Sequence, residues 1–344
     1  MIPVDQRIKA FGRLGDALRQ ALFNSDAEGA LPHDLQQAIL KAGQQNAWFT
    51  SAQVLHALSQ WAGVLEEKNL ATWLKPYQKQ LEKVKGKTIG VVNAGNIPLV
   101  GFHDFMSVLL SGHRYLGKNS SDDNVLLPFL AGRLAEIEPA FAKVISFTER
   151  LKDYDAVIAT GSNNSARYFE YYFGKVPHII RKNRNAVALL DGKETEAQLM
   201  ALGEDVFRYF GLGCRSVSHL LLPQDYDFSK LFGAFENYAD IRHHNKYINN
   251  YDYYKSVLIL KKILFYDNGF LIVKKDESIA SPIAILNYSF YKSPEEAEAW
   301  LTANAENIQC VVSHRHLAFG SAQHPALNEY ADGVDTMEFL VGIK

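Results

Sequence analysis

Residues 88–99 have the sequence TIGVVNAGNIPL, in which a short apolar run is followed by a polar loop and a proline. The run 88–93 predicts a buried strand, and Pro98 fits the first turn of a helix. The same alternation continues with strands expected at RYLG (114–117), KVISF (143–147) and DAVIAT (155–160), and helices at VLLPFLAGRLAEI (125–137) and SARYFEYYFG (165–174). Strands alternating with helices predict a mostly parallel sheet that binds ligands near the carboxyl ends of its strands.

The stretch after residue 190 repeats this alternation. A helix is expected over roughly 195–209, and the capping box SPEE (293–296) predicts a helix through EEAEAWLTAN. Further strands are expected at HLLLP (219–223), VLILKK (257–262), GFLIVKK (269–275), IAILNYSF (283–290) and CVVSH (310–314). The tail 319–344 is polar and turn-rich, without obvious regular structure.

Residues 1 to about 85 predict helices. The segments RIKAFGRLGDALRQAL (7–22) and SAQVLHALSQWAGVL (51–65) place apolar residues three and four positions apart, and Thr50 or Ser51 is the expected N-cap of the second. The sequence therefore predicts an α/β chain with an N-terminal helical segment.

Length and charge limit the classes of protein. The chain of 344 residues is long enough for two domains, and its net charge of −2 lacks the basic excess that nucleic acids and anionic membranes require. The longest apolar stretch, 97–110, contains charged and polar residues and is too short to span a bilayer. The N-terminus has no apolar signal-peptide core, so we expect a cytoplasmic protein without a membrane span or a nucleic-acid partner.

Cys214 is the first candidate for chemistry. It follows Gly211 and Gly213 and precedes a strand, a setting where the backbone can approach a ligand closely and favour a thiolate. The alternative is an inert buried thiol, which is common for free cysteines. Cys310, in an apolar strand, is interpreted as core. With two cysteines and scattered histidines, we expect neither a disulfide framework nor a metal site.

Polar residues also follow the predicted strands of the first half. Asn96 lies just before a helix, where its amide could donate to a developing oxyanion or simply cap that helix. Thr160, Gly161 and Ser162 form a small-residue turn that opens a helix and suits a pyrophosphate. Lys118 and Ser120 in GKNSS (117–121) suit ribose or phosphate contacts, or belong to a solvated loop.

Two other interpretations are weaker. The chain has neither the G-x-S-x-G nor the HExxH motif. The adjacent histidines His243 and His244 lie in NYADIRHHNKYINNYDYYK (237–255), which is interpreted as an exposed loop or a substrate-facing lid.

The order of these motifs resembles a known superfamily. GNIPL, GKNSS, DYDAVIATGS and GLGC are similar to the W-N-F-P-L, K-P-S, F-T-G-S and G-Q-x-C motifs of aldehyde dehydrogenases, in the same order. The tail FGSAQHPALNEYADGVDTMEFL and the motif set most resemble the long-chain acyl-CoA reductases, the fatty-acid reductase family of bacterial luminescence. The resemblance covers roughly residues 85–344.

This resemblance implies an aldehyde-dehydrogenase-like α/β fold with two Rossmann-like open parallel-sheet domains. We expect residues 1–190 to form the N-terminal helices and the nicotinamide-dinucleotide domain, and 191–318 the catalytic cysteine domain. The tail 319–344 is expected to pack back on the cofactor domain. The resemblance also implies a homo-oligomer and an acyl-CoA or acyl-carrier substrate, with an acyl-donating enzyme as a further partner.

Residue roles follow from the same resemblance. Cys214 would become acylated, while the amide of Asn96 would stabilise the oxyanion. The cofactor pyrophosphate would lie against Thr160, Gly161 and Ser162, and the adenosine ribose or its 2′-phosphate near Lys118 and Ser120. Glu277 would correspond to the nicotinamide-ribose ligand of the family motif E-x-F-G-P-V, although Pro282 follows it at five positions instead of four.

One departure from the superfamily indicates the direction of the reaction. The E-L-G-G-K motif of aldehyde oxidisers supplies a general base, and its counterpart here, RKNRNAVALL (181–190), contains no glutamate. A reductase discharges its acyl-enzyme with hydride and needs no activated water. We therefore expect NADPH-dependent reduction of a long-chain acyl thioester, with NADH as the other cofactor considered. The alternatives are an oxidative aldehyde dehydrogenase, a cysteine acyl-transfer protein and a catalytically silent scaffold.

Overall fold

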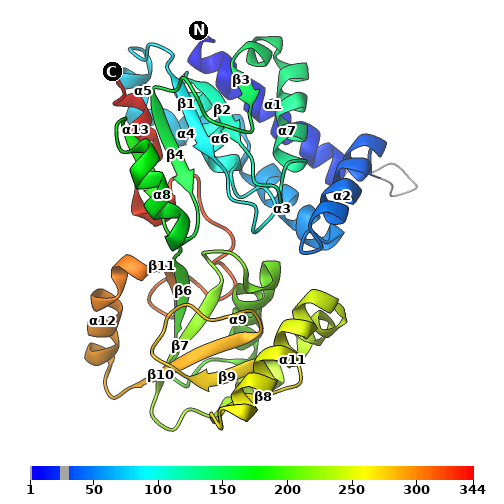
Figure 1. Ribbon diagram of the computed structural model, residues 1–344, viewed down its shortest axis with the longest axis vertical. Helices are drawn as coiled ribbons and strands as arrows, with labels where there is room; N and C mark the ends of the chain where they lie inside the picture. Colours follow the sequence, from blue (N-terminus) through cyan, green and yellow to red (C-terminus); the bar gives the residue numbers. More distant parts are fainter. Residues whose placement is uncertain (1, 24–30) are drawn as a thin grey trace. The chain divides into compact units, whose positions relative to one another are not determined.

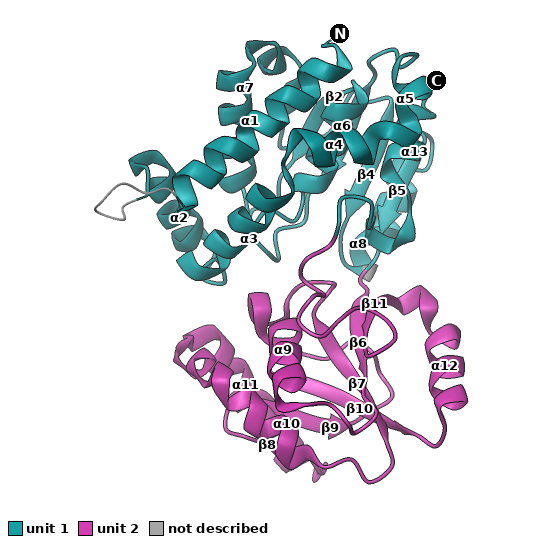
Figure 2. Ribbon diagram, turned by 180° about the vertical axis from the view of Figure 1, so that it is seen from behind, with its two compact units in different colours: residues 1–182, 326–344 teal, residues 183–325 magenta. Residues whose placement is uncertain are grey.

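The computed structural model describes residues 2–23 and 31–344, which belong to two compact units (Figures 1 and 2). Unit 1 comprises residues up to 182 together with 326–344, and unit 2 comprises 183–325. The division falls at 182/183 and 325/326, whereas the sequence-based expectation has 190/191 and 318/319. The first shift arises because strand Asn185–Leu189 pairs with strands of unit 2. Residues 24–30, within the expected helical region, lie outside the described residues.

Unit 1 is built on a five-stranded parallel sheet with the order β3-β2-β1-β4-β5. Its strands are β1 (Thr88–Val92), β2 (Arg114–Lys118), β3 (Ile145–Phe147), β4 (Ala156–Thr160) and β5 (His178–Arg181). The chain moves outward from β1 in one direction and from β4 in the other, so the crossover helices lie on opposite faces. The loops that follow β1 and β4 therefore diverge toward opposite faces at the carboxyl edge of the sheet. Sheets of this topology bind ligands at that point.

Helices cover both faces of this sheet (Figure 1). They are α1 (Val4–Phe23), α2 (His33–Gln45), α3 (Ser51–Val64), α4 (Glu67–Leu74), η1 (Lys75–Tyr77), α5 (Gln78–Leu81), α6 (Phe102–Ser111), α7 (Leu126–Ile137), η2 (Pro139–Lys143), α8 (Asn163–Phe173), η6 (Ala331–Gly333) and α13 (Thr336–Val341). Phe11 of α1 is fully buried, and its ring lies 6.3 Å from that of Phe105 in α6 and 5.9 Å from that of Phe141 in η2. This aromatic cluster explains why α1 belongs to unit 1.

Unit 2 contains a six-stranded sheet with the order β11-β6-β7-β10-β9-β8, parallel except for β8 at the edge. Its strands are β6 (Asn185–Leu189), β7 (Val217–Pro223), β8 (Tyr266–Asp267), β9 (Ile272–Lys275), β10 (Ile285–Tyr291) and β11 (Ile308–Val312). Its helices are α9 (Glu196–Phe207), η3 (Arg208–Gly211), α10 (Phe228–Phe235), η4 (Glu236–His243), α11 (Asn245–Leu260), α12 (Pro294–Ala303) and η5 (Ala305–Asn307). These parallel sheets confirm the predicted α/β fold class.

Four local expectations are wrong, and a fifth is only half right. The helix expected from Pro98 begins at Phe102, because the chain turns at Leu99, which has a φ of 59°. The strand expected at 257–262 is mostly the end of α11, and 237–255 is helical rather than a loop. The tail contains α13, whose N-cap Asp335 accepts a hydrogen bond from the backbone N–H of Glu338. The capping box at Ser293 is half formed, since the Glu296 carboxylate accepts from the N–H of Lys292.

A membrane-spanning helix was not expected. Among the residues that the structure describes, no helix has both the length and the apolar character needed to cross a bilayer.

Candidate functional site

The carboxyl end of β1 leads into loop 93–101, which carries Asn96 at an exposed position. The base of this loop is fixed by Asn93, which is 7% exposed. The Asn93 side-chain amide donates hydrogen bonds to the Tyr115 hydroxyl at 2.7 Å and to the Asn119 side-chain oxygen at 2.9 Å. An exposed amide on a loop with an anchored base can donate to a ligand at this edge of the sheet.

The loop that follows β2 lies directly against loop 93–101. A Cβ placed on Gly95 would be 2.7 Å from the Cβ of Ser120, so only glycine allows the two segments to approach this closely. Lys118, half-buried at the end of β2, accepts a hydrogen bond at its backbone oxygen from the N–H of Asn93 at 2.9 Å. The structure thus brings together the loops of three predicted site residues, Asn96, Lys118 and Ser120.

A buried carboxylate, Asp123, connects these loops through hydrogen bonds to their backbone. The sequence motifs did not predict this role. Asp123 is 7% exposed and accepts hydrogen bonds from the backbone N–H groups of Leu126, Leu99 and Val125. Burial raises the pKa of Asp123 to about 6, although these hydrogen bonds lower it. The only local signal in the sequence is the polar run 119–124, which is equally typical of a solvated turn.

The turn after β4 has the features of a phosphate cradle. Ser162 is the N-cap of α8, and its hydroxyl accepts a hydrogen bond from the N–H of Ser165 at 3.2 Å. A Cβ on Gly161 would lie 2.8 Å from Cε2 of Phe169, so the glycine allows the backbone of the turn to lie close to the Phe169 ring. Thr160 accepts a long hydrogen bond of 3.5 Å at its hydroxyl from Arg181. The first N–H groups of a helix and its dipole attract an anion, so this turn fits a dinucleotide pyrophosphate.

In unit 2, Cys214 lies in a tight turn between η3 and β7, and both cysteines of the chain are thiols. The turn is closed by the Ser216 N–H, which donates to the Gly213 carbonyl at 3.0 Å, and by the Gly213 N–H, which donates to the Ser216 hydroxyl at 3.2 Å. Cys214 is half-buried. Cys214 is therefore carried on a backbone that these two hydrogen bonds fix.

Three consecutive residues before this turn have positive φ angles. The values are 53° for Tyr209, 58° for Phe210 and 75° for Gly211. The left-handed conformation is unfavourable for aromatic residues, so the surrounding structure must stabilise it. Phe210 is 7% exposed, and its ring centroid lies 4.2 Å from that of His244. The helical segment 237–255 therefore supports the backbone that leads to Cys214.

A second buried carboxylate, Asp205, ties a distant segment to this region. It is 0% exposed and accepts hydrogen bonds from the N–H groups of Gly320 at 2.7 Å and Ala322 at 2.8 Å. The guanidinium of Arg215, the residue after Cys214, donates to the Ala322 carbonyl. Burial raises the pKa of Asp205 to about 6. No sequence motif marks Asp205, because its partners lie more than a hundred positions away.

Two further predicted residues lie on other elements of unit 2. Glu277 is exposed in the loop after β9, and the carbonyl of its neighbour Ser278 lies 3.1 Å from Nδ1 of His219 in β7. This contact places the Glu277 loop beside the strand that follows Cys214. Cys310, which was interpreted as core, is half-buried in β11.

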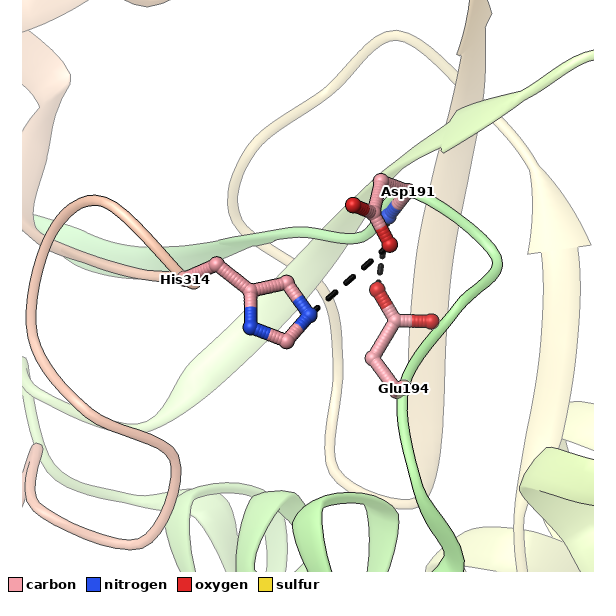
Figure 3. A group of neighbouring side chains, drawn as sticks. All are labelled: Asp191, Glu194 and His314. Atoms are coloured by element: carbon pink, nitrogen blue, oxygen red, sulfur yellow. Dashed lines mark hydrogen bonds and ion pairs between the residues drawn. The ribbon is translucent and has the colours of Figure 1, made fainter.

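One group of potential metal ligands occurs in the described part of unit 2 (Figure 3). The ligand atoms of Asp191, Glu194 and His314 lie within 4.8 Å of one another. Glu194 already accepts hydrogen bonds from the N–H groups of Asp191 at 2.6 Å and Gly192 at 3.1 Å. Nε2 of His314 is 3.8 Å from Oδ1 of Asp191. These contacts explain the grouping, because Glu194 closes the turn that begins at Asp191 and His314 lies beside Asp191 at the surface.

Comparison with known proteins gives one family match. Residues 3–229 match the family described as acyl-CoA reductase (LuxC). A search among the curated proteins gave no match.

Several solved structures with the same fold are aldehyde dehydrogenases. Aldehyde dehydrogenase 21 from Physcomitrella patens, in complex with the reaction product succinate, has a TM-score of 0.65 at 11% identity, over 99% of this chain and 84% of that one. The Mycobacterium tuberculosis aldehyde dehydrogenase complexed with NAD+ has a TM-score of 0.60 at 16% identity, over 91% and 74%. Betaine aldehyde dehydrogenase from Staphylococcus aureus, in complex with NAD+, has a TM-score of 0.62 at 12% identity, over 95% and 73%. At these identities the likeness establishes the fold.

Proposed function

Because the chain belongs to the acyl-CoA reductase (LuxC) family, we propose that it reduces a long-chain acyl thioester to the aldehyde through an acyl group carried on Cys214. Family membership and the aldehyde-dehydrogenase fold support an aldehyde-related oxidoreductase. The observation that carries the finer proposal is the turn around Cys214, which holds a half-buried thiol on a backbone fixed by Gly213 and Ser216.

The first step in this proposal is a thiol exchange. The Cys214 thiolate attacks the carbonyl carbon of the acyl thioester, a new carbon–sulfur bond forms, and the original one breaks to release CoA or the carrier as a thiolate. The two thiolates have similar basicity, so this step needs little acid–base assistance. The side-chain amide of Asn96 donates a hydrogen bond to the oxyanion that forms on the carbonyl oxygen.

The second step reduces the acyl group held on Cys214. A nicotinamide cofactor supplies the hydride for this chemistry when it is bound. Asn96 again stabilises negative charge on the former carbonyl oxygen, and Cys214 then leaves as a thiolate to release the aldehyde. The sulfur returns to its initial state, so Cys214 can accept another acyl group.

Residues of unit 1 fit the cofactor. Gly161 and Ser162 would hold the pyrophosphate at the start of α8, where the absence of a Cβ on Gly161 lets the turn pack against Phe169 and Ser165 of that helix. Lys118 and Ser120 would contact the adenosine ribose or its 2′-phosphate, and a lysine there favours NADPH over NADH. Thr160 would support the turn through its bond to Arg181. Glu277, which belongs to unit 2, is proposed as a nicotinamide-ribose ligand.

The reductive direction is supported by segment 181–190. It contains no glutamate that could activate water, and its first residue, Arg181, is buried in an ion pair with Asp104. An acyl-enzyme that lacks the glutamate of this motif would be hydrolysed more slowly and would survive until hydride is available.

The decisive experiment measures NADPH oxidation with a long-chain acyl-CoA for the wild type, Cys214→Ala and the matched control Cys310→Ala. We expect the near-ultraviolet absorbance of NADPH to fall for the wild type and the control and to stay constant for Cys214→Ala. Aldehyde should form in equal amount to the NADPH consumed. Acylation of Cys214 without NADPH loss would favour an acyl-transfer protein, and neither signal would favour a scaffold. Acid formed from aldehyde and NAD(P)+ without CoA would indicate an oxidative enzyme.

A further inference from the structure

A cavity lies in unit 1, apart from the residues proposed to bind the cofactor. Its volume is about 300 Å³, within the range of small-molecule sites. It is lined by the first residue of β2, Arg114, and by residues that precede β1 and β3, including Lys85 and Val144. The strands of this sheet are parallel, so the cavity lies at their amino ends, whereas Lys118 and Thr160 lie at the carboxyl ends.

The wall of the cavity contains a buried arginine without a counter-ion. Arg7 is 2% exposed, and burial lowers its pKa to about 10. Its guanidinium donates one hydrogen bond, to the carbonyl of Leu110 at the end of α6, while its Nε is buried without a partner. Within residues 2–23 and 31–344, no carboxylate pairs with Arg7. A buried cation is costly unless it is paired, which points to an anion from solution.

Three other side chains of the lining carry a positive charge, as Arg7 does. Lys85, Arg114 and Lys143 are cationic, and the described lining residues include no aspartate or glutamate. At the same edge, Asp155 is already engaged by Lys87 and by the N–H of Thr88. The fifth polar residue, His113, accepts from the N–H of Lys87 and therefore donates to the Leu340 carbonyl, which leaves it neutral.

The charge and the apolar part of the wall together define the ligand. Several cations around one cavity favour a group with more than one negative charge, which a phosphate monoester carries and a carboxylate does not. Leu109, Phe141 and Val144 add an apolar surface that could cover the organic part of the molecule. We propose that this cavity binds a small phosphorylated molecule, with its phosphate against Arg7, at a site separate from the reaction.

The experiment titrates the full chain with phenyl phosphate, inorganic phosphate and benzoate by calorimetry. Benzoate keeps the ring but carries a single charge, while inorganic phosphate keeps the charge and lacks the ring. The test variant, Lys85→Gln/Lys143→Gln, changes two exposed lysines of the lining, and the matched control, Lys83→Gln/Lys152→Gln, changes two exposed lysines outside it. If phenyl phosphate bound at the turn of Gly161 and Ser162 instead, the test variant and the control would bind it equally, because neither pair of substitutions alters that turn.

We expect the wild type and the control to bind phenyl phosphate most tightly and inorganic phosphate less tightly. Both should bind benzoate at least about tenfold more weakly than phenyl phosphate. The test variant should bind phenyl phosphate at least about tenfold more weakly than the control. Phenyl phosphate should also raise the melting temperature of the wild type more than that of the test variant. Equal binding by both variants, no binding by the wild type, or benzoate binding as tightly as phenyl phosphate would each overturn the proposal. These outcomes do not depend on reductase activity.

Discussion

Arg181 at the end of β5 forms a bidentate ion pair with Asp104 in α6, and both side chains are almost completely buried. One terminal nitrogen of the guanidinium donates to Oδ1 of Asp104 at 2.9 Å, and the other donates to Oδ2 at 2.5 Å. Arg181 also donates to the hydroxyl of Thr336 in α13 at 2.9 Å and to that of Thr160 at 3.5 Å. One guanidinium therefore joins the end of the sheet, two helices and the turn proposed to bind the cofactor.

Removing one partner of this pair should strongly destabilise unit 1. We expect Asp104→Asn to lower the free energy of unfolding by about 3–5 kcal/mol, because the Arg181 charge stays buried without a counter-ion. The double variant Asp104→Leu/Arg181→Met should lose less than Asp104→Asn, since it buries no charge. Urea unfolding of the three proteins measures both differences. A double variant as unstable as the single one would show that packing, rather than charge, decides the stability here.

Gly95→Ala tests the close contact between two loops of the candidate site. The new methyl group would lie 2.7 Å from the Cβ of Ser120, so we expect a loss of about 1–3 kcal/mol in the free energy of unfolding. Ser120→Gly removes the opposing Cβ and should recover most of this loss in the double variant. Urea unfolding of the four proteins in the cycle gives the coupling energy. Additive effects of the two substitutions would contradict the contact.

Local patterns were sufficient to predict the elements that the backbone forms from its own neighbours. The apolar run 88–93 forms β1, because a buried parallel strand is apolar on both faces. Thr50 caps α3 as expected, since an N-cap bond joins residues only three positions apart. The order of the motifs also indicated the family, which the match over residues 3–229 supports.

Features that depend on distant residues could not be predicted in this way. The run 257–262 is rich in β-branched and apolar residues and suggested a strand, yet the helix capped by His244 continues through it to Leu260. Asp205 and Asp123 look like ordinary surface acids in the sequence, because their backbone donors come from other segments. The buried Arg7 likewise has no local signal, since its partner Leu110 lies on another helix.

The stability of unit 2 should depend on pH through His219. This residue is fully buried in β7, where Nε2 lies 2.8 Å from the Ser289 hydroxyl, and burial lowers its pKa to about 4. Between about pH 6.5 and pH 4 the unfolded chain therefore binds a proton that the folded protein does not. Because of this lowered pKa of His219, the free energy of unfolding is highest above about pH 6.5 and falls as the pH decreases. At pH 4 the loss is about 3 kcal/mol.

The comparison with His219→Gln isolates this contribution, because all other titrating groups are common to both proteins. From pH 7 to pH 4, we expect the free energy of unfolding of the wild type to fall by about 3 kcal/mol more than that of His219→Gln. His33→Gln, at an exposed position in α2, is the control and should follow the wild type. A constant difference between wild type and His219→Gln would show that this histidine does not titrate as proposed.

Lys118 should control the preference between the two nicotinamide cofactors. We expect Lys118→Gln to raise the KM for NADPH about tenfold and to leave that for NADH almost unchanged, because the lysine would contact the 2′-phosphate that only NADPH carries. Initial rates with each cofactor at saturating acyl-CoA measure this, with Lys152→Gln, at an exposed position, as the control. An equal rise in both KM values would place Lys118 at a part of the cofactor that both molecules share.

Asn96 should affect the rate of reduction rather than the stability of the protein. Its side chain is exposed on loop 93–101, whose base is fixed by Asn93, so Asn96→Ala should change the free energy of unfolding by less than about 0.5 kcal/mol. If its amide stabilises the oxyanion, the same substitution should lower kcat about 10²–10³-fold and change the KM for the acyl-CoA little. Asn69→Ala, at an exposed position in α4, is the control and should retain full activity. A variant that loses affinity for the acyl-CoA while retaining kcat would instead make Asn96 a substrate-binding residue, since an interaction used equally in the ground state and the transition state changes KM alone.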